Sequence, residues 1–139
     1  FFGITGGVRR EHMGRAVLEA IAYQVKEAIE AMNRDSSKAI EVLKVDGGAC
    51  QNDFLMQFQA DALGIPIERP VVLEATAQGA AFGAGLAIGY WTDYQKLCRS
   101  RKIDRIFEPG TGAIQAQENF HTWLKAVNRA QHWVDESHL

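Results

Sequence analysis

The chain has 139 residues, enough for one domain with a substantial apolar core. Its net charge of −2, with Lys and Arg spread along the chain, leaves no basic excess to neutralise phosphates, so we expect no nucleic-acid partner. Two cysteines without metal-like spacing, Cys50 and Cys98, favour a reducing, cytoplasmic compartment over a disulfide-stabilised fold. No apolar run approaches the ~18 residues of a membrane-spanning helix.

A long amphipathic helix is predicted after the glycine-rich residues 1–10, because apolar side chains recur there every three or four positions. The recurring residues are Met13, Val17, Ile21, Val25, Ala28, Ile29 and Met32. The polar sequence at 35–37 is expected to end this helix. His12, near its beginning, is interpreted as a surface residue.

A strand, a glycine turn and a second helix are predicted next. The strand covers residues 42–45, the turn contains Gly47 and Gly48, and the helix ends at Gly64. Adjacent glycines let a flat ligand approach the backbone, and the unpaired amides that begin a helix attract anionic groups. A nucleotide would therefore fit, although many α/β proteins use the same pattern only to turn the chain. Cys50 is interpreted as a quiet, buried or half-buried thiol.

The third predicted helix, beginning near Thr76 as its N-cap, consists mainly of small residues. Glycine inside a helix costs roughly 0.5–1 kcal/mol relative to alanine, a loss tolerated where another backbone must come close. We expect this helix to pack tightly on a neighbouring helix, at an interdomain hinge. A short strand at 65–68 precedes it, and its proline indicates an edge or an early strand position.

The remaining elements are a short helix capped by Asp93, an extended segment at 103–107 and a last amphipathic helix at 116–134. Trp123 and Trp133 are interpreted as packing groups. Only two or three short strands accompany these long helices, and a sheet that small is only marginally stable by itself in water. The chain is therefore predicted to be part of an α/β domain whose other strands lie outside these residues. Because it begins with Phe1, we expect a piece of a longer polypeptide.

The segment from Val45 to Gly64 resembles the adenosine segment of the glycerol kinases in the FGGY carbohydrate kinase family. The similarity covers about residues 1–134 and is most specific at residues 54–59. Other matching stretches are Gly3-Ile4-Thr5, Gly7-Val8, Leu18-Glu19, Ile21-Ala22-Tyr23-Gln24, Glu68-Arg69-Pro70, Thr76-Ala77, Gly79-Ala80-Ala81 and Gly85-Leu86-Ala87. The resemblance implies part of an actin-like ATPase (ribonuclease H-like) C-terminal lobe. Residues 1–139 would be the C-terminal part of that FGGY domain, with its upstream lobe missing.

The resemblance also implies a reaction, in which ATP and Mg²⁺ phosphorylate glycerol to sn-glycerol 3-phosphate. The catalytic aspartate, the glycerol contacts and the phosphate loops would lie upstream, so no catalytic residue or metal ligand is expected here. By resemblance, Gly48 contacts the adenine through its backbone, Asn52 directs its amide to the nucleotide, and Gly47 lets the chain pass the ribose. Asp46 either positions the turn or lies near Mg²⁺.

Two alternatives remain open at this stage. One is a non-catalytic nucleotide-binding or assembly module, and the other is a kinase of another polyol or sugar. No rival catalytic set is evident, and the acids Glu41, Glu68 and Glu74 are interpreted as solvated. We expect either a homo-oligomer or an assembly with the missing lobe.

Overall fold

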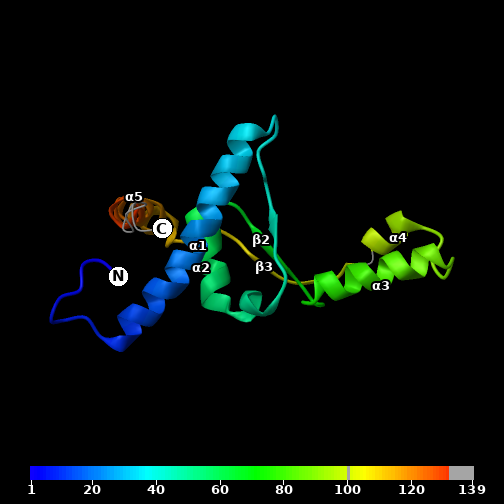
Figure 1. Ribbon diagram of the computed structural model, residues 1–139, viewed down its shortest axis with the longest axis horizontal. Coiled ribbons are helices and arrows are strands. Elements are labelled where there is room, and N and C mark those ends of the chain that lie inside the picture. The colour runs from blue at the N-terminus through cyan, green and yellow to red at the C-terminus, as the bar shows by residue number, and fades with distance from the viewer. Residues whose placement is uncertain (100, 132–139) are drawn as a thin grey trace, which may run out of the picture.

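The computed structural model describes residues 1–99 and 101–131. Within them the elements are α1 (Arg10–Asp35), β1 (Leu43–Lys44), η1 (Gly48–Gln51, a 3-10 helix), α2 (Asp53–Leu63), β2 (Ile67–Pro70), α3 (Ala75–Ala87), α4 (Tyr94–Arg99), β3 (Ile103–Phe107) and α5 (Ala113–Ala130). Figure 1 shows α1, α2, α5 and the sheet gathered in one body, from which α3 and α4 extend as an arm. The predicted helix-rich α/β composition is confirmed. Trp133 and the predicted end of the last helix lie outside the described residues.

Helix α2 is the centre of the body. Asn52 caps its first turn by accepting a hydrogen bond from the Leu55 amide at 3.0 Å, and Gly64 ends it in the left-handed conformation, with φ of 72°. Between these ends, α2 packs against α1, α5 and the sheet. Its buried residues are Leu55, Met56, Phe58, Gln59, Ala60, Asp61 and Ala62. The predicted helix and its glycine terminator are confirmed.

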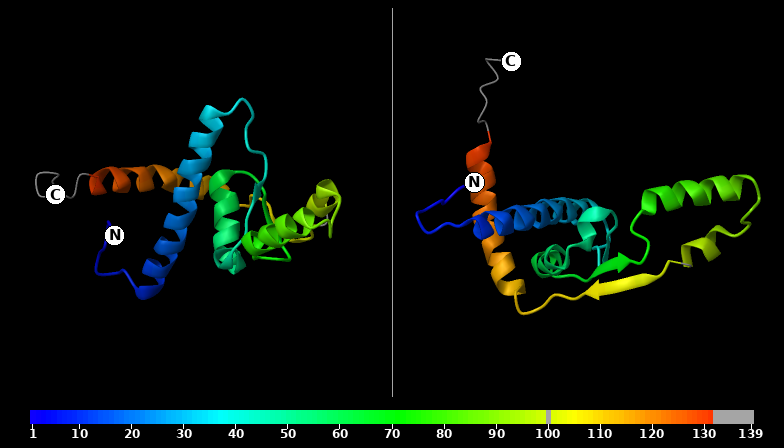
Figure 2. Two further views of the ribbon diagram at one scale, coloured as in Figure 1. Left: turned by 45° about the vertical axis from the view of Figure 1, so that its right-hand side comes forward. Right: turned by 90° about the horizontal axis from the view of Figure 1, so that it is seen from below.

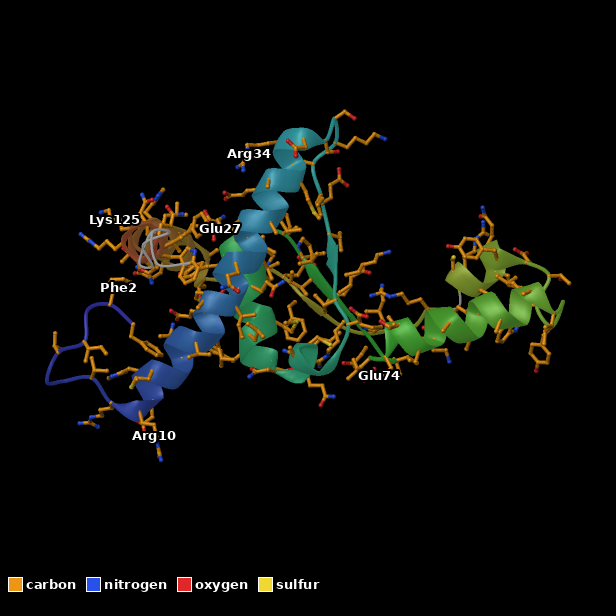
Figure 3. The ribbon with its side chains drawn as sticks, in the orientation of Figure 1. Phe2, Arg10, Glu27, Arg34, Glu74 and Lys125 are labelled. Atoms are coloured by element: carbon orange, nitrogen blue, oxygen red, sulfur yellow. The ribbon has the colours of Figure 1, made fainter. Side chains whose placement is uncertain are left out.

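Tyr23 of α1 joins the three helices of the body. Its ring meets Phe58 of α2 edge-on at 5.4 Å and lies 5.6 and 5.8 Å from Phe120 and Trp123 of α5, between ring centroids. Its hydroxyl donates to the Ala116 carbonyl at 3.1 Å. Trp123 also donates to Glu27, which Figure 3 labels on α1 beside α5. The packing role predicted for Trp123 is confirmed.

The burial of Tyr23 predicts a pH effect on stability. Burial, and then the nearby charge of Glu19, raises the pKa of Tyr23 from 10.0 to about 12. Because the raised pKa favours the neutral hydroxyl in the folded state, this contribution is full below pH 10 and is lost as the pH rises towards 12.

We therefore expect Tyr23→Phe to lower stability by about 1 kcal/mol near neutral pH, as one hydrogen bond is lost. For a chain of 139 residues this corresponds to a melting midpoint lower by roughly 4 °C. The difference between the two melting midpoints should disappear by about pH 11, because the wild-type phenol loses its advantage there. A difference that stays constant across this range would contradict the assignment.

The sheet is mixed, in the order β1-β2-β3, with β1 parallel and β3 antiparallel to β2. Strand β2 is therefore central, so of the two positions predicted from Pro66 the edge is wrong and the early one agrees with the structure. Pro66 lies just before the strand, where its carbonyl accepts from the Leu43 amide at 3.0 Å and its own lack of an N–H interrupts no pairing. The extended segment predicted at 103–107 is confirmed as β3.

The arm consists of α3 and α4, which both views of Figure 2 place together and away from α1 and α5. Helix α3 begins with Glu74 at the N-cap position and no side-chain cap, so the prediction of Thr76 as the cap is wrong. The cap predicted for α4 is confirmed, since Asp93 accepts from the Lys96 amide at 3.0 Å. Figure 3 labels Glu74 where the arm leaves the body.

The small residues of α3 are mostly exposed within the part of the chain that the structure describes. Only Gly85 is crowded, because a β-carbon there would collide with the Trp91 ring. Gly79 and Gly83 have open space where a β-carbon would point. The predicted packing of α3 on a neighbouring helix is not formed among these residues, so a partner helix stays a prediction.

Candidate functional site

Gly47 makes the turn that follows β1. Its φ of 79° and ψ of 175° lie in a region that side chains disfavour, so this position requires glycine for backbone reasons. Its amide donates to the Leu73 carbonyl at 2.7 Å, and its carbonyl accepts from the Cys50 thiol at 2.9 Å. Hydrogen bonds at both its amide and its carbonyl therefore hold Gly47 in place.

Gly48 differs from Gly47, because its backbone conformation does not require glycine. It opens η1, is exposed, and does not have a positive φ. A β-carbon built on it would have no atom within 4 Å. The fold of the described residues therefore does not require glycine here, and chain reversal accounts for Gly47 alone. The open space above Gly48 is where a flat ligand could meet the backbone.

Asn52 follows η1 and is exposed. Its Oδ1 is the N-cap acceptor of α2, and no hydrogen bond from its Nδ2 occurs among residues 1–99 and 101–131. The sequence interpretation had both amide atoms facing the nucleotide. The structure instead assigns the oxygen to the helix and leaves the amino group, a donor, for an acceptor on a ligand.

Variants of Asn52 should separate these two roles. In Asn52→Ser the hydroxyl can still cap α2, whereas Asn52→Ala should lower the free energy of unfolding by about 1 kcal/mol. If Nδ2 donates to a nucleotide, both variants should raise the KM for ATP in the complete polypeptide by about two- to tenfold. Melting curves and steady-state kinetics check the two effects. A Ser variant with unchanged KM for ATP would restrict Asn52 to capping.

Cys50 and Asp46 flank the glycine pair in different environments. The Cys50 thiol is buried, as predicted, and burial raises its pKa above the ordinary 9.0. Asp46 is exposed, and its side chain makes no hydrogen bond or ion pair within the described ranges. In the same ranges, no group of three or more His, Cys, Asp or Glu side chains could hold a metal ion.

A charged cluster under the turn was not predicted from the sequence. Arg69 of β2 donates to the Cys50 carbonyl at 3.0 Å, to Asp53 at 2.7 Å and to Asp104 at 2.8 Å. Arg105 of β3 donates to the other oxygen of Asp53 at 2.6 Å. The hydrogen bond from Arg69 is the largest cause that lowers the pKa of Asp53 below its ordinary value. Only strand register, which pairs Arg69 with Arg105, reveals this cluster.

One acid was misinterpreted in the sequence. Glu68, expected to be solvated, accepts from Arg101 at 2.9 Å, and the two side chains are only 18% and 28% exposed. This pair lies beside a hollow of about 360 Å³ next to the glycine turn. The hollow is lined by Lys44, Val45, Asp46, Pro70, Val71, Val72, Ala75, Gln78, Arg101 and Lys102. It therefore lies at the carboxyl ends of the parallel strands β1 and β2, a common ligand position in α/β sheets.

No helix within residues 1–99 and 101–131 has both the length and the apolar character needed to cross a membrane.

Comparisons with known proteins place this strand, turn and helix in a family. Residues 1–88 match the C-terminal domain of the FGGY family of carbohydrate kinases. The chain is 68% identical over 134 residues to a glycerol kinase of Rippkaea orientalis and 67% identical over 135 residues to one of Acaryochloris marina, covering 96% and 97% of this chain. The structure of Plasmodium falciparum glycerol kinase with ADP superposes with a TM-score of 0.78 at 32% identity, over 96% of this chain and 27% of that one.

The chain therefore belongs to the FGGY family of carbohydrate kinases, and its fold is part of the actin-like lobe of that family. It is similar to glycerol kinases in particular, and it spans only 27% of the length of each of the two relatives.

Proposed function

We propose that this chain is the adenosine-binding, C-terminal part of an ATP-dependent glycerol kinase. The complete protein would transfer the γ-phosphate of ATP to glycerol and release sn-glycerol 3-phosphate and ADP. The observation that carries the proposal is the exposed turn, where Gly48 is open although the fold does not require a glycine. Similarity to glycerol kinases at 68% identity supports the choice of substrate.

The turn fits a nucleoside in three respects. The backbone of Gly48 can lie flat against the base, because no side chain covers it. Asn52 can donate from Nδ2 to a base nitrogen, since its Oδ1 is held by the Leu55 amide. Gly47 brings the chain past the ribose without a side chain. These residues would bind and orient the nucleotide, and orientation itself contributes to rate in phosphoryl transfer.

The described residues offer no metal cluster, so we propose that Mg²⁺ arrives with the phosphates of ATP and is held elsewhere in the complete protein. When bound, Mg²⁺ would neutralise charge on the phosphates. The contribution of this chain is to fix the adenosine end of the nucleotide. No catalytic residue is proposed within it.

We also propose that residues 1–139 are an incomplete part of the FGGY C-terminal domain. Among residues 1–99 and 101–131, the short β1 has one unpaired edge and α3 carries exposed small residues. The rest of the polypeptide would cover these surfaces, as exposed edges otherwise pair with other chains. In its absence a homo-oligomer could cover the same surfaces. The cysteine usage supports a cytoplasmic location.

The test of the proposed function is product formation by the complete polypeptide that contains this chain. Incubated with ATP, Mg²⁺ and glycerol, it should yield sn-glycerol 3-phosphate, detected by phosphorus NMR. Other polyols and sugars at the same concentration serve as competing substrates. A protein that phosphorylates a different polyol or sugar, and leaves glycerol unchanged, would refute the assignment of glycerol.

A further inference from the structure

We infer that Arg69 is a positioning residue of the adenosine site. Its side chain holds the η1 turn in a fixed position relative to the sheet. The inference rests on the proposed function, because it assigns Arg69 a role in that same site. Arg69 would not touch the nucleotide. It would act through the backbone of the residues that do.

The guanidinium of Arg69 binds three acceptors from three different segments. Its Nη1 donates to the Cys50 carbonyl in η1 at 3.0 Å and to Asp53 at the start of α2 at 2.7 Å. Its Nε donates to Asp104 of β3 at 2.8 Å. One side chain from the central strand thus ties the turn and the helix start to the sheet.

The side chain of Arg69 is well fixed. It is only 13% exposed, and its guanidinium carbon lies 5.1 Å from the centre of the Phe107 ring. A planar guanidinium presents several donors in fixed directions, whereas a lysine ammonium is a single point charge on a flexible stem. Lysine at this position could therefore retain one acceptor but not hold all three in place.

The contacts of Arg69 adjoin both proposed nucleotide contacts. Cys50 lies between Gly48 and Asn52 in the chain, and Asp53 follows Asn52 directly. The backbone amide of Asn52 in turn donates to the Ala49 carbonyl at 3.2 Å, so a hydrogen bond closes the turn on both sides of Cys50. A shift of the Cys50 carbonyl would move both contacts together. A misplacement of about 1 Å can cost an enzyme roughly 100-fold in rate, so small shifts of the turn matter.

Arg105 provides a matched control within the same cluster. It donates to Asp53 at 2.6 Å and lies 4.5 Å from the centre of the Phe107 ring. Its side chain is 52% exposed, and it makes no hydrogen bond to the backbone of η1. Removing its charge therefore disturbs the ion cluster without releasing the turn.

The experiment compares Arg69→Gln, Arg69→Lys and Arg105→Gln in the complete polypeptide. Calorimetry with ADP gives Kd, and steady-state kinetics gives kcat and the KM values for ATP and glycerol. We expect Arg69→Gln to raise the Kd for ADP and the KM for ATP about tenfold, the equivalent of one charge-assisted hydrogen bond. For Arg69→Lys, the Kd for ADP and the KM for ATP should lie between the values of Arg69→Gln and wild type. Arg105→Gln should change the Kd for ADP and the KM for ATP less than about twofold. The KM for glycerol should stay at its wild-type value in all three variants.

Equal Kd values for folded Arg69→Gln and Arg105→Gln would overturn the inference, because both would then act only on general stability. If Arg69→Gln does not fold, Arg69→Lys provides the test. A wild-type Kd for ADP in Arg69→Lys would then overturn the inference. Wild-type protein that binds no ADP would instead refute the proposed function itself. Normal ADP binding that is weakened by Gly48→Val but not by either Arg69 variant would refute only the positioning role.

Discussion

Gly48→Val is expected to raise the KM for ATP in the complete polypeptide by roughly five- to hundredfold, as inserted methyl groups overlap the base. The free energy of unfolding should change by less than about 0.5 kcal/mol. The reason is that a β-carbon at Gly48 meets no atom within 4 Å and the backbone φ is not positive. The KM for glycerol should stay near its wild-type value, since the substitution touches only the nucleotide side.

Two neighbouring variants make this prediction specific. Gly48→Ala should have an intermediate KM for ATP, because it adds a single methyl group. Gly47→Val should destabilise the protein by about 1–2 kcal/mol, as φ of 79° strains any side chain. A folded Gly48→Val protein with wild-type KM for ATP would show that nothing binds above Gly48.

The second large effect concerns the chain by itself. The purified 139-residue chain is expected to show no ATP-dependent phosphorylation of glycerol, because under the proposed function it supplies only the adenosine end of the site. Among its described residues, no group of acids, histidines or cysteines could hold a metal ion. Positioning alone cannot replace the charge stabilisation that phosphoryl transfer requires.

A coupled assay for ADP release, with and without glycerol, measures this activity. Glycerol-dependent turnover whose specific activity stays constant through further purification would contradict the prediction. The complete polypeptide, assayed in parallel, shows that the coupling enzymes respond.

Elements defined by local patterns could be predicted from the sequence. The helical spacing from Met13 to Met32 identified α1, and Gly64 marked the end of α2, because both signals depend on nearby residues. The glycine turn was also recognisable, but the sequence did not show which of the two glycines the backbone requires. The structure separates them, since only Gly47 has a positive φ.

Features that depend on distant partners could not be predicted. The central position of β2 results from pairing with β3, which lies beyond the arm in the sequence. The Arg69 cluster requires the register that places Arg69 opposite Arg105. Asn52 illustrates a competition between roles, because the helix start uses the oxygen that the resemblance assigned to a ligand. The apolar stripe of α1 was predicted, yet Val17 and Ile21 remain 48% and 39% exposed because α2 and α5 cover only part of it.

The most direct test of the account is to locate bound adenine chemically. The complete polypeptide would be photolabelled with 8-azido-ATP, with and without excess ATP, and cleaved after glutamate. Cleavage after Glu41 and Glu68 releases residues 42–68, which contain Gly48 and Asn52. The account predicts label in this peptide that excess ATP suppresses and that Gly48→Val greatly reduces. ATP-protected label found only outside residues 42–68 would contradict it.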